Sequence, residues 1–196
     1  MNVVLVDSGG ANIGSLRYAL QRLGVEAGLT RDAAAIRAAD RVILPGVGAA
    51  VPAMVRLRES GLADVLRSLT QPVLGVCLGM QLLCTHSEEG DVDGLGLIDA
   101  DVRRFDDSGG LRVPHMGWNR VEALASNPLF AADAGSGWAY FVHGYAVPVG
   151  AATLATCDYG GPFSAAIGRD NFLGVQFHPE RSAEFGMATL RNFLAS

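Results

Sequence analysis

Residues 73–81 read VLGVCLGMQ, and this short stretch says most about the architecture. Its first four residues are apolar, as in a strand covered on both faces, and a helix is expected directly after Cys77. Glycine stands two positions before and two positions after Cys77. This spacing is typical of a nucleophile elbow, a tight turn that strains the backbone of its central residue and leaves no room for flanking side chains. The stretch therefore predicts an α/β sheet in which Cys77 ends a buried strand.

Cys77 would then stand at the start of a helix, where the helix dipole favours the thiolate. The backbone N–H of Leu78 would be placed to donate to an oxyanion. A buried structural cysteine is the alternative interpretation for Cys77. It is our expectation for Cys84 and Cys157, because neither has the glycine frame.

Strands and helices alternate through the first half of the chain and predict a mostly parallel sheet with helices on both faces. The expected strands are 3–6, 25–29, 42–44 and 73–76, and the expected helices are 13–23, ending at Gly24, and 51–69, broken at Gly61. Past about residue 95, short alternating runs predict added antiparallel strands at 119–124, 139–142, 153–157, 164–167 and 172–177. We expect Ser182 to cap a final helix, and residues 1–196 to form one domain, because no linker or repeat interrupts them.

The composition excludes several classes of function. The chain of 196 residues is 49% hydrophobic with a formal charge of -5, so it has no basic surplus for nucleic acid. All 15 basic residues are arginine, which excludes Schiff-base and P-loop lysine chemistry. Three cysteines are too few for a secreted disulfide scaffold, and we find neither a signal peptide nor a membrane span. A cytoplasmic, soluble protein is expected.

Residues 175–180 read VQFHPE and contain a second group of chemically useful side chains. On an extended backbone His178 and Glu180 point to the same side, and Pro179 favours extension at His178. A carboxylate beside an imidazole fixes the ring tautomer, so Cys77, His178 and Glu180 are candidates for nucleophile, base and orienting acid. A solvated strand end is the alternative for the His–Glu pair alone.

The sequence gives no reason to expect a metal ion or another cofactor. Neither a HExxH motif nor paired CxxC motifs occur, and His86, His115 and His143 have no ligand partners at suitable spacing.

Together these segments resemble the class I, triad-type glutamine amidotransferases, which have a flavodoxin-like fold. Four further segments resemble the glutaminase subunit of imidazole glycerol phosphate synthase: 7–13 (DSGGANI), 44–48 (LPGVG), 114–119 (PHMGWN) and 140–143 (YFVH). The motifs span residues 7–182, so the resemblance implies a single glutamine amidotransferase type 1 domain over nearly the whole chain.

The resemblance implies a role for each matching residue. Cys77 would attack the side-chain amide of glutamine and release ammonia, His178 would transfer the protons, and Glu180 would orient His178. The N–H of Leu78 and the loop of Val47 and Gly48 would form the oxyanion hole. The substrate contacts would come from Gly48, Gln81, Glu89, Gly144 and Tyr145. For Glu89 a solvated acidic turn is the alternative.

The resemblance also implies a partner, a (β/α)8-barrel cyclase subunit that forms a heterodimer with this chain and receives the ammonia through a tunnel. The complex would make imidazole glycerol phosphate and an aminoimidazole carboxamide ribotide in histidine biosynthesis. The positions that would face this partner and gate the ammonia are Asn12, Trp118, Tyr140 and Arg181. The alternatives are a helix cap for Asn12, core aromatics for Trp118 and Tyr140, and a solvated charge for Arg181.

Three residues depart from the family pattern. Arg181 stands where lysine is usual, Ser8 replaces a frequent tyrosine, and Gly144 replaces a small polar residue. Arginine has a planar, forked head, so the gate at Arg181 is expected to differ in geometry.

Four rival functions stay open at this point. Gly9, Ala11 and Gly14 approximate a dinucleotide-binding motif, but alanine replaces the glycine that lets the backbone approach pyrophosphate. The other rivals are an elbow hydrolase of esters or thioesters, a partner-binding subunit without chemistry, and the glutaminase of another synthase such as that for pyridoxal phosphate.

Overall fold

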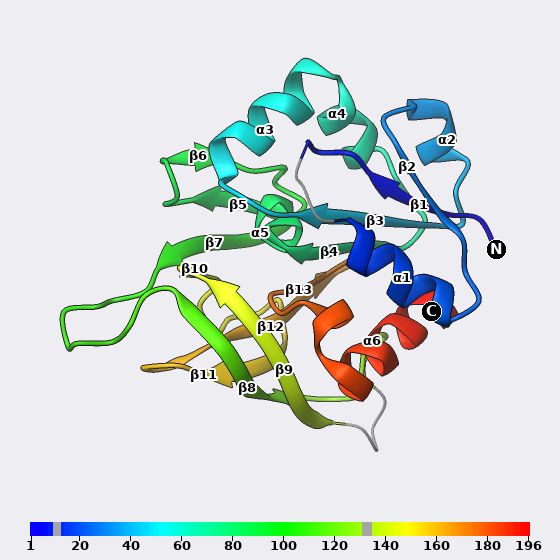
Figure 1. The fold of residues 1–196 in the computed structure, drawn as a ribbon. Helices are drawn as coiled ribbons and strands as arrows, with labels where there is room; N and C mark the ends of the chain where they lie inside the picture. Colours follow the sequence, from blue (N-terminus) through cyan, green and yellow to red (C-terminus); the bar gives the residue numbers. More distant parts are fainter. Residues whose placement is uncertain (10–12, 131–134) are drawn as a thin grey trace.

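A large mixed sheet runs through the computed structural model, which describes residues 1–9, 13–130 and 135–196 (Figure 1). Its strands are β1 (Val3–Val6), β2 (Ala27–Thr30), β3 (Arg41–Gly46), β4 (Val73–Cys77), β8 (His115–Ala123), β9 (Ser136–His143), β11 (Thr153–Asp158), β12 (Pro162–Arg169) and β13 (Phe172–Val175). In space they follow the order β2-β1-β3-β4-β13-β12-β11-β8-β9. The first five in this order are parallel, and the rest join antiparallel. The predicted parallel sheet with added antiparallel strands is confirmed.

Helices cover both faces of this sheet, as the apolar strands predict. One face carries α1 (Gly14–Arg22) and α6 (Ala183–Ala195), and the other carries α2 (Ala33–Arg37), α3 (Ala50–Glu59), α4 (Leu62–Arg67) and α5 (Leu78–Leu83) (Figure 1). Strand β1 shows how one run of apolar residues serves both cores. Val3 and Leu5 join the core under α1, and Val4 and Val6 join the core under α3.

The predicted helix boundaries depended on glycine and agree with the structure. Gly24 follows α1 with φ +78°, and Gly61 separates α3 from α4 with φ +70°. The longest helix, α6, has 13 residues. Within the described residues, no helix has the length and apolar character required to cross a bilayer.

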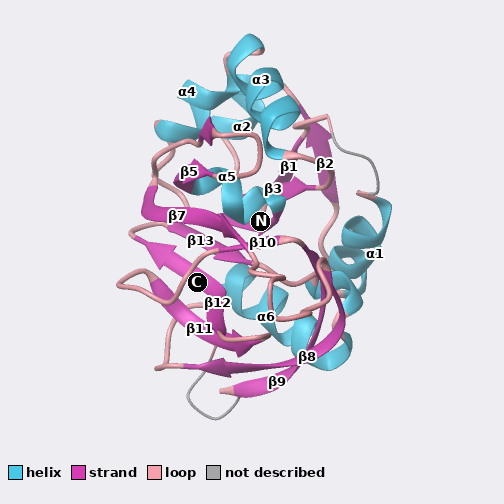
Figure 2. Cartoon of the chain, turned by 90° about the vertical axis from the view of Figure 1, so that its left-hand side faces the viewer, coloured by secondary structure: helices cyan, strands magenta, loops and turns pink. Residues whose placement is uncertain are grey.

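A second, smaller sheet did not emerge from the sequence pattern. Its strands are β5 (Cys84–Ser87), β6 (Val92–Asp93), β7 (Ile98–Arg104) and β10 (Tyr145–Ala146), in the order β10-β7-β5-β6. In Figures 1 and 2 it lies between helix α3 and the strands β8 and β11. Strand β7 buries only Ile98 and Val102 in the core, because polar residues occupy most of its other positions.

Candidate active site

Cys77 occupies the elbow that the sequence predicts. It ends β4 with φ 54° and ψ −114°, a backbone conformation that is unfavourable for a residue with a side chain, and α5 begins at Leu78. A Cβ atom at Gly75 would lie 2.6 Å from the carbonyl oxygen of Gly79. A Cβ atom at Gly79 would overlap the carbonyl oxygen of Leu44 on the neighbouring strand. The two glycines are therefore required by the close packing of the turn.

The loop after β3 lies beside this elbow. Gly46 pairs with Cys77 in the parallel register of β3 and β4, and a Cβ atom at Gly46 would overlap the backbone nitrogen of Gly79. Gly48 follows with φ +95°. The residues expected to form an oxyanion hole, Leu78, Val47 and Gly48, thus lie at the carboxyl ends of two adjacent strands.

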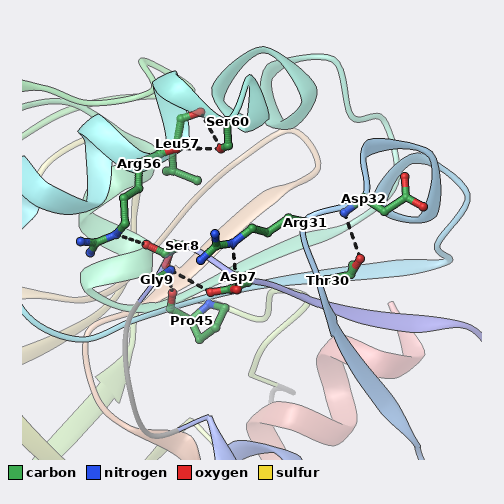
Figure 3. Close-up of polar contacts among 10 residues, drawn as sticks. All are labelled: Asp7, Ser8, Gly9, Thr30, Arg31, Asp32, Pro45, Arg56, Leu57 and Ser60. Carbon is green, nitrogen blue, oxygen red and sulfur yellow. Dashed lines mark hydrogen bonds and ion pairs between the residues drawn. The ribbon is translucent and has the colours of Figure 1, made fainter.

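The loop after β1 is tied to the same region (Figure 3). The Ser8 hydroxyl donates to the carbonyl oxygen of Pro45 at 3.2 Å, and Arg56 on α3 donates to the carbonyl oxygen of Ser8 at 2.7 Å. Asp7 pairs with Arg31 at 2.8 Å. Ser8 therefore holds the end of β1 against the strand that leads to Val47.

The HPE segment brings the second group of site residues to the sheet by a route that differs from the prediction. Strand β13 ends at Val175, and Pro179–Arg181 forms the 3-10 turn η2, so the expected extended backbone through Glu180 is wrong. Proline fits the first position of such a turn, because its fixed φ is compatible with it. His178 itself is extended, with φ −94° and ψ 98°, and its Nδ1 lies 3.0 Å from Oε1 of Glu180.

Ser182 anchors this segment to the sheet. Its hydroxyl donates to the carbonyl oxygen of His178 at 2.7 Å and accepts from the backbone N–H of Tyr140 at 2.9 Å. Ser182 is the N-cap residue of α6, as predicted, but its fully buried hydroxyl is used here and makes no cap hydrogen bond. His178 also donates its backbone N–H to the carbonyl oxygen of Tyr140 at 2.9 Å, so β9 fixes the height of His178 above the sheet.

The electrostatics favour a charged imidazole at His178. Burial acts against the charge, but hydrogen bonds to Cys77 and Glu180, with the charges of these groups, raise the pKa of His178 to about 10. Because Nδ1 faces Glu180, Nε2 is the nitrogen left for the thiol. Oε2 of Glu180 is the one buried side-chain oxygen or nitrogen of the described residues without a hydrogen-bond partner. The structure therefore groups Cys77, His178 and Glu180.

Two residues expected to contact substrate are joined to Cys77 through a third residue that the sequence did not single out. Gln81 is buried and donates to the carbonyl oxygen of Tyr145 at 3.0 Å and to Oε1 of Gln176 at 2.9 Å. Gln176 is fully buried, and its Nε2 lies 3.8 Å from the sulfur of Cys77. The sequence feature that could have indicated a role for Gln176 is its amide side chain two positions before His178.

The other expected substrate residues have structural contacts of their own. Glu89 accepts the backbone N–H of Ala50 at 2.9 Å, at the first residue of α3, so its carboxylate caps a helix that starts just after the Val47 loop. Gly144 accepts the backbone N–H of Phe105 at 3.1 Å. An added Cβ at Gly144 would lie 3.5 Å from Val113, an ordinary contact, so the position has room for a Cβ atom.

Three of the four residues expected at the partner surface lie together. Trp118 on β8 pairs with Tyr140 on β9, with ring centroids 6.0 Å apart, and the guanidinium carbon of Arg181 lies 4.3 Å from the centroid of the Tyr140 ring. Trp118 is 52% exposed, so it is not a core aromatic. Met116 and Trp138 are 60% exposed on the same pair of strands, and the sequence did not single them out. Asn12 lies outside the described residues.

No cluster of three or more histidine, cysteine, aspartate or glutamate side chains suited to a metal ion occurs in the described ranges. Cys84 and Cys157 are free and buried, and burial raises the pKa of each thiol to about 12.

Comparison with known proteins identifies the family. The family Glutamine amidotransferase class-I matches residues 4–196. Imidazole glycerol phosphate synthase subunit HisH of Xanthomonas axonopodis pv. citri is 57% identical, and the alignment covers 98% of this chain and 96% of that protein. The HisH subunit of Xylella fastidiosa is 56% identical with the same coverage. A crystal structure of a glutamine amidotransferase shares the fold with a TM-score of 0.75 at 24% identity, covering 99% of this chain and 98% of that one. The chain therefore belongs to the class-I glutamine amidotransferases and, among them, to the family of the HisH subunit of imidazole glycerol phosphate synthase.

Proposed function

We propose that this chain is the glutaminase subunit of an imidazole glycerol phosphate synthase, and that it uses Cys77, His178 and Glu180 to hydrolyse glutamine in histidine biosynthesis. One observation carries the proposal. Cys77 on its strained elbow and His178, which lies 3.0 Å from the buried Glu180, follow two adjacent parallel strands, β4 and β13. The chain that carries this arrangement is 57% identical to a HisH subunit. Residues 1–196 would act as a single domain in the cytoplasm.

The reaction runs in two halves. The Cys77 thiolate attacks the side-chain carbonyl carbon of glutamine, and the imidazolium of His178 gives its proton to the departing amide nitrogen, so ammonia leaves and a glutamyl thioester remains. His178 then takes a proton from water, whose oxygen attacks the thioester. The thioester then breaks, glutamate leaves, and the thiolate of Cys77 and the imidazolium of His178 are restored. The raised pKa of His178 supports this cycle, because it keeps the imidazole of His178 charged before glutamine arrives.

Two backbone donors would stabilise the negative oxygen of each tetrahedral intermediate. One is the N–H of Leu78 at the first residue of α5. The other comes from the Val47–Gly48 loop, which begins beside Cys77 and has Gly48 at φ +95°. Glycine at this position makes a peptide flip sterically cheap, so the second donor can be brought into place when the partner is loaded.

Around the substrate, Gln81, Tyr145, Gly144 and Gly48 would line the glutamine pocket, and Glu89 would receive its ammonium group. At present the Glu89 carboxylate accepts the N–H of Ala50, so substrate would share this carboxylate with the start of α3.

The partner would be a (β/α)8-barrel cyclase that forms a one-to-one heterodimer with this chain and receives the ammonia. The exposed aromatic face of β8 and β9 supports this docking site, because Trp118 packs edge to face against Tyr140 and Arg181 lies over the same Tyr140 ring. Asn12 would join this surface.

Glutamate release tests the proposal in three conditions: this chain alone, with the cyclase, and with the cyclase and its ribotide ligand. We expect a low basal rate that rises steeply only in the third condition, and loss of activity in Cys77→Ala. Cys157→Ala removes another buried thiol and is the matched control. A high rate that ignores the partner would contradict the gated oxyanion hole and reopen the choice of synthase. Absence of glutamate in every condition would overturn the proposal.

A further inference from the structure

A continuous series of hydrogen bonds connects strand β8 with the sulfur of Cys77, and its first half consists of two histidines. Nδ2 of Asn119 lies 3.4 Å from Nε2 of His115, and Nδ1 of His115 lies 3.1 Å from Nε2 of His143. Nδ1 of His143 lies 2.8 Å from the carbonyl oxygen of Tyr145. His115 and His143 are directly opposite each other in the register of β8 and β9.

The carbonyl oxygen of Tyr145 fixes which nitrogens of these rings carry hydrogen. A carbonyl only accepts, so Nδ1 of His143 is the donor, and Nε2 of a neutral ring is then an acceptor. It follows that His115 donates from Nδ1 and accepts at Nε2 from the amide of Asn119. That amide is oriented independently, because Oδ1 of Asn119 accepts the N–H of Arg120 at 2.7 Å and its Nδ2 donates to the carbonyl oxygen of Asp158 at 2.8 Å. Both rings are therefore neutral Nδ1–H tautomers.

The second half of the series consists of two amides, and the same carbonyl fixes their direction. Nε2 of Gln81 donates to Tyr145 and to Oε1 of Gln176, so both of its N–H groups are used. If the amide of Gln176 were reversed, its NH2 group would face the NH2 group of Gln81. If both amides were reversed, Oε1 of Gln81 would face the carbonyl oxygen of Tyr145. Neither arrangement forms hydrogen bonds, so Gln176 must present an N–H to the sulfur of Cys77.

Burial makes this arrangement rigid. Gln176 is fully buried, and Gln81, His115 and His143 are each at most 6% exposed. Phe105, Phe141 and Phe163 pack around the two imidazole rings. Buried polar groups hold their partners strictly, because an unpaired one is costly in such surroundings.

Building on the proposed glutaminase function, we propose that Gln176 is a positioning residue that donates a hydrogen bond to the sulfur of Cys77, and that the carbonyl oxygen of Tyr145, which also accepts from the His115–His143 pair, holds this donor in its direction through Gln81. An N–H donor stabilises the thiolate more than the thiol, so Gln176 supports the nucleophile independently of the proton transfer by His178. The same direction leaves Oε1 as the free polar atom of Gln81. The pocket therefore presents an acceptor there, which fits an ammonium or amide donor of glutamine.

Alkylation of Cys77 by iodoacetamide as a function of pH tests the donor directly. Cys84 and Cys157, with pKa values of about 12, react little below about pH 9, so the profile reports Cys77. We expect Gln176→Met, which keeps the length and removes the donor, to raise the apparent pKa of alkylation by about one unit and to lower kcat about tenfold with a smaller change in KM. Gln71→Met is the matched control, because Gln71 donates to the carbonyl oxygen of Ile36, away from the site. A Gln176→Met profile equal to that of the unsubstituted chain overturns the proposal.

A second measurement needs no variant. The chain has 4 histidines, so the ring nitrogens can be assigned in the ¹⁵N spectrum of the intact protein. We expect His115 and His143 to be neutral Nδ1–H tautomers near neutral pH. An Nε2–H tautomer or a charged ring at either position overturns the proposed arrangement of the histidine pair at the Tyr145 carbonyl. Neither the alkylation profile nor the ¹⁵N spectrum requires turnover, so a failure of the glutaminase function and a failure of this hydrogen-bonded series give different results.

Discussion

The HPE segment and the strand pair β8–β9 each bury a histidine, and the two rings are held in opposite protonation states. The His178 side chain is 12% exposed and His143 is 6% exposed. Nevertheless the pKa of His178 is raised to about 10, and the pKa of His143 is lowered to about 3. His178 faces the carboxylate of Glu180 and the sulfur of Cys77, whereas His143 faces a carbonyl oxygen and a neutral ring. The comparison shows that a buried imidazole is charged only where its partners outweigh the cost of burial.

The two regions also act on each other. Burial has the largest effect in lowering the pKa of His143, and the charges of His115 and His178 lower it further, against the hydrogen bond to Tyr145. A charged His178 thus helps to keep His143 neutral. The proton is confined to the ring that transfers it in the proposed reaction.

The largest expected effect comes from Glu180→Gln, which removes the charge and keeps the size. We expect glutamine hydrolysis to fall on the order of 10³-fold, because the orienting carboxylate and the stabilised imidazolium are both lost. The pKa of His178 should fall with it, which would make this ring resemble His143. Initial rates of glutamate release and a ¹⁵N titration check both results, with Glu184→Gln as the control. A rate within tenfold of the unsubstituted chain would show that Glu180 does not orient His178.

The next largest effect is expected from acid, which should destabilise the fold around the neutral pair of His115 and His143. His115 and His143 have folded pKa values of about 4 and about 3, below the ordinary 6.5. As the pH falls, the unfolded chain therefore binds protons on these rings before the folded chain does. Stability is therefore complete above about pH 6.5 and is lost as the pH falls. Between about pH 7 and 5, His115 and His143 each lower the free energy of unfolding by about 2 kcal/mol. The raised pKa of His178 offsets less than about 1 kcal/mol of this loss.

Urea unfolding at several pH values between these limits measures this loss. The variant His143→Asn keeps a donor toward Tyr145 and removes one titrating ring, so its pH dependence should be flatter. Equal slopes for the variant and the unsubstituted chain would contradict the assignment of neutral buried rings.

The elbow could be predicted from sequence because its determinants are local. Gly75 and Gly79 frame Cys77 within five residues, and the close approaches that exclude their side chains confirm the reason. The pairing of His178 and Glu180 was also predicted, although the backbone that achieves it is a turn and not a strand. Short spacing is sufficient here, because either backbone allows residues two positions apart to meet.

The long-range contacts of the site could not be predicted in the same way. Gln176 reaches Cys77 across 99 positions of sequence, and this contact depends on β13 lying beside β4. His115 and His143 meet only because the register of β8 and β9 places them opposite each other, and a shift of one residue would separate them. Strand β7 was missed because Asp99 and Asp101 occupy the alternate positions of a strand that buries little.

Asn119→Asp should raise the pKa of His115, so that the His115–His143 pair becomes partly charged, as His178 is. A carboxylate at this position accepts where the amide donated, so it favours hydrogen on Nε2 of His115 and opposes the direction of the series. We expect the pKa of His115 to rise by about one unit or more, since an opposite charge within a few ångströms favours the imidazolium. The ¹⁵N titration of the variant measures the shift. An unchanged pKa would mean that solvent screens this end of the series.

The smallest effect is expected at His86, the remaining histidine. Its Nε2 lies 3.2 Å from Asp91 and its Nδ1 lies 3.4 Å from Asp93, but both carboxylates are largely exposed, at 97% and 83%. Water and ions screen such pairs, so His86→Ala should change the free energy of unfolding by less than about 1 kcal/mol and leave glutamate release unchanged. Chemical denaturation at low and high salt measures this contribution. A larger decrease in the free energy of unfolding for a His86 variant than for a His143 variant would mean that exposed carboxylates stabilise an imidazole strongly. Burial of the His178–Glu180 pair would then explain less of the difference between His178 and His143.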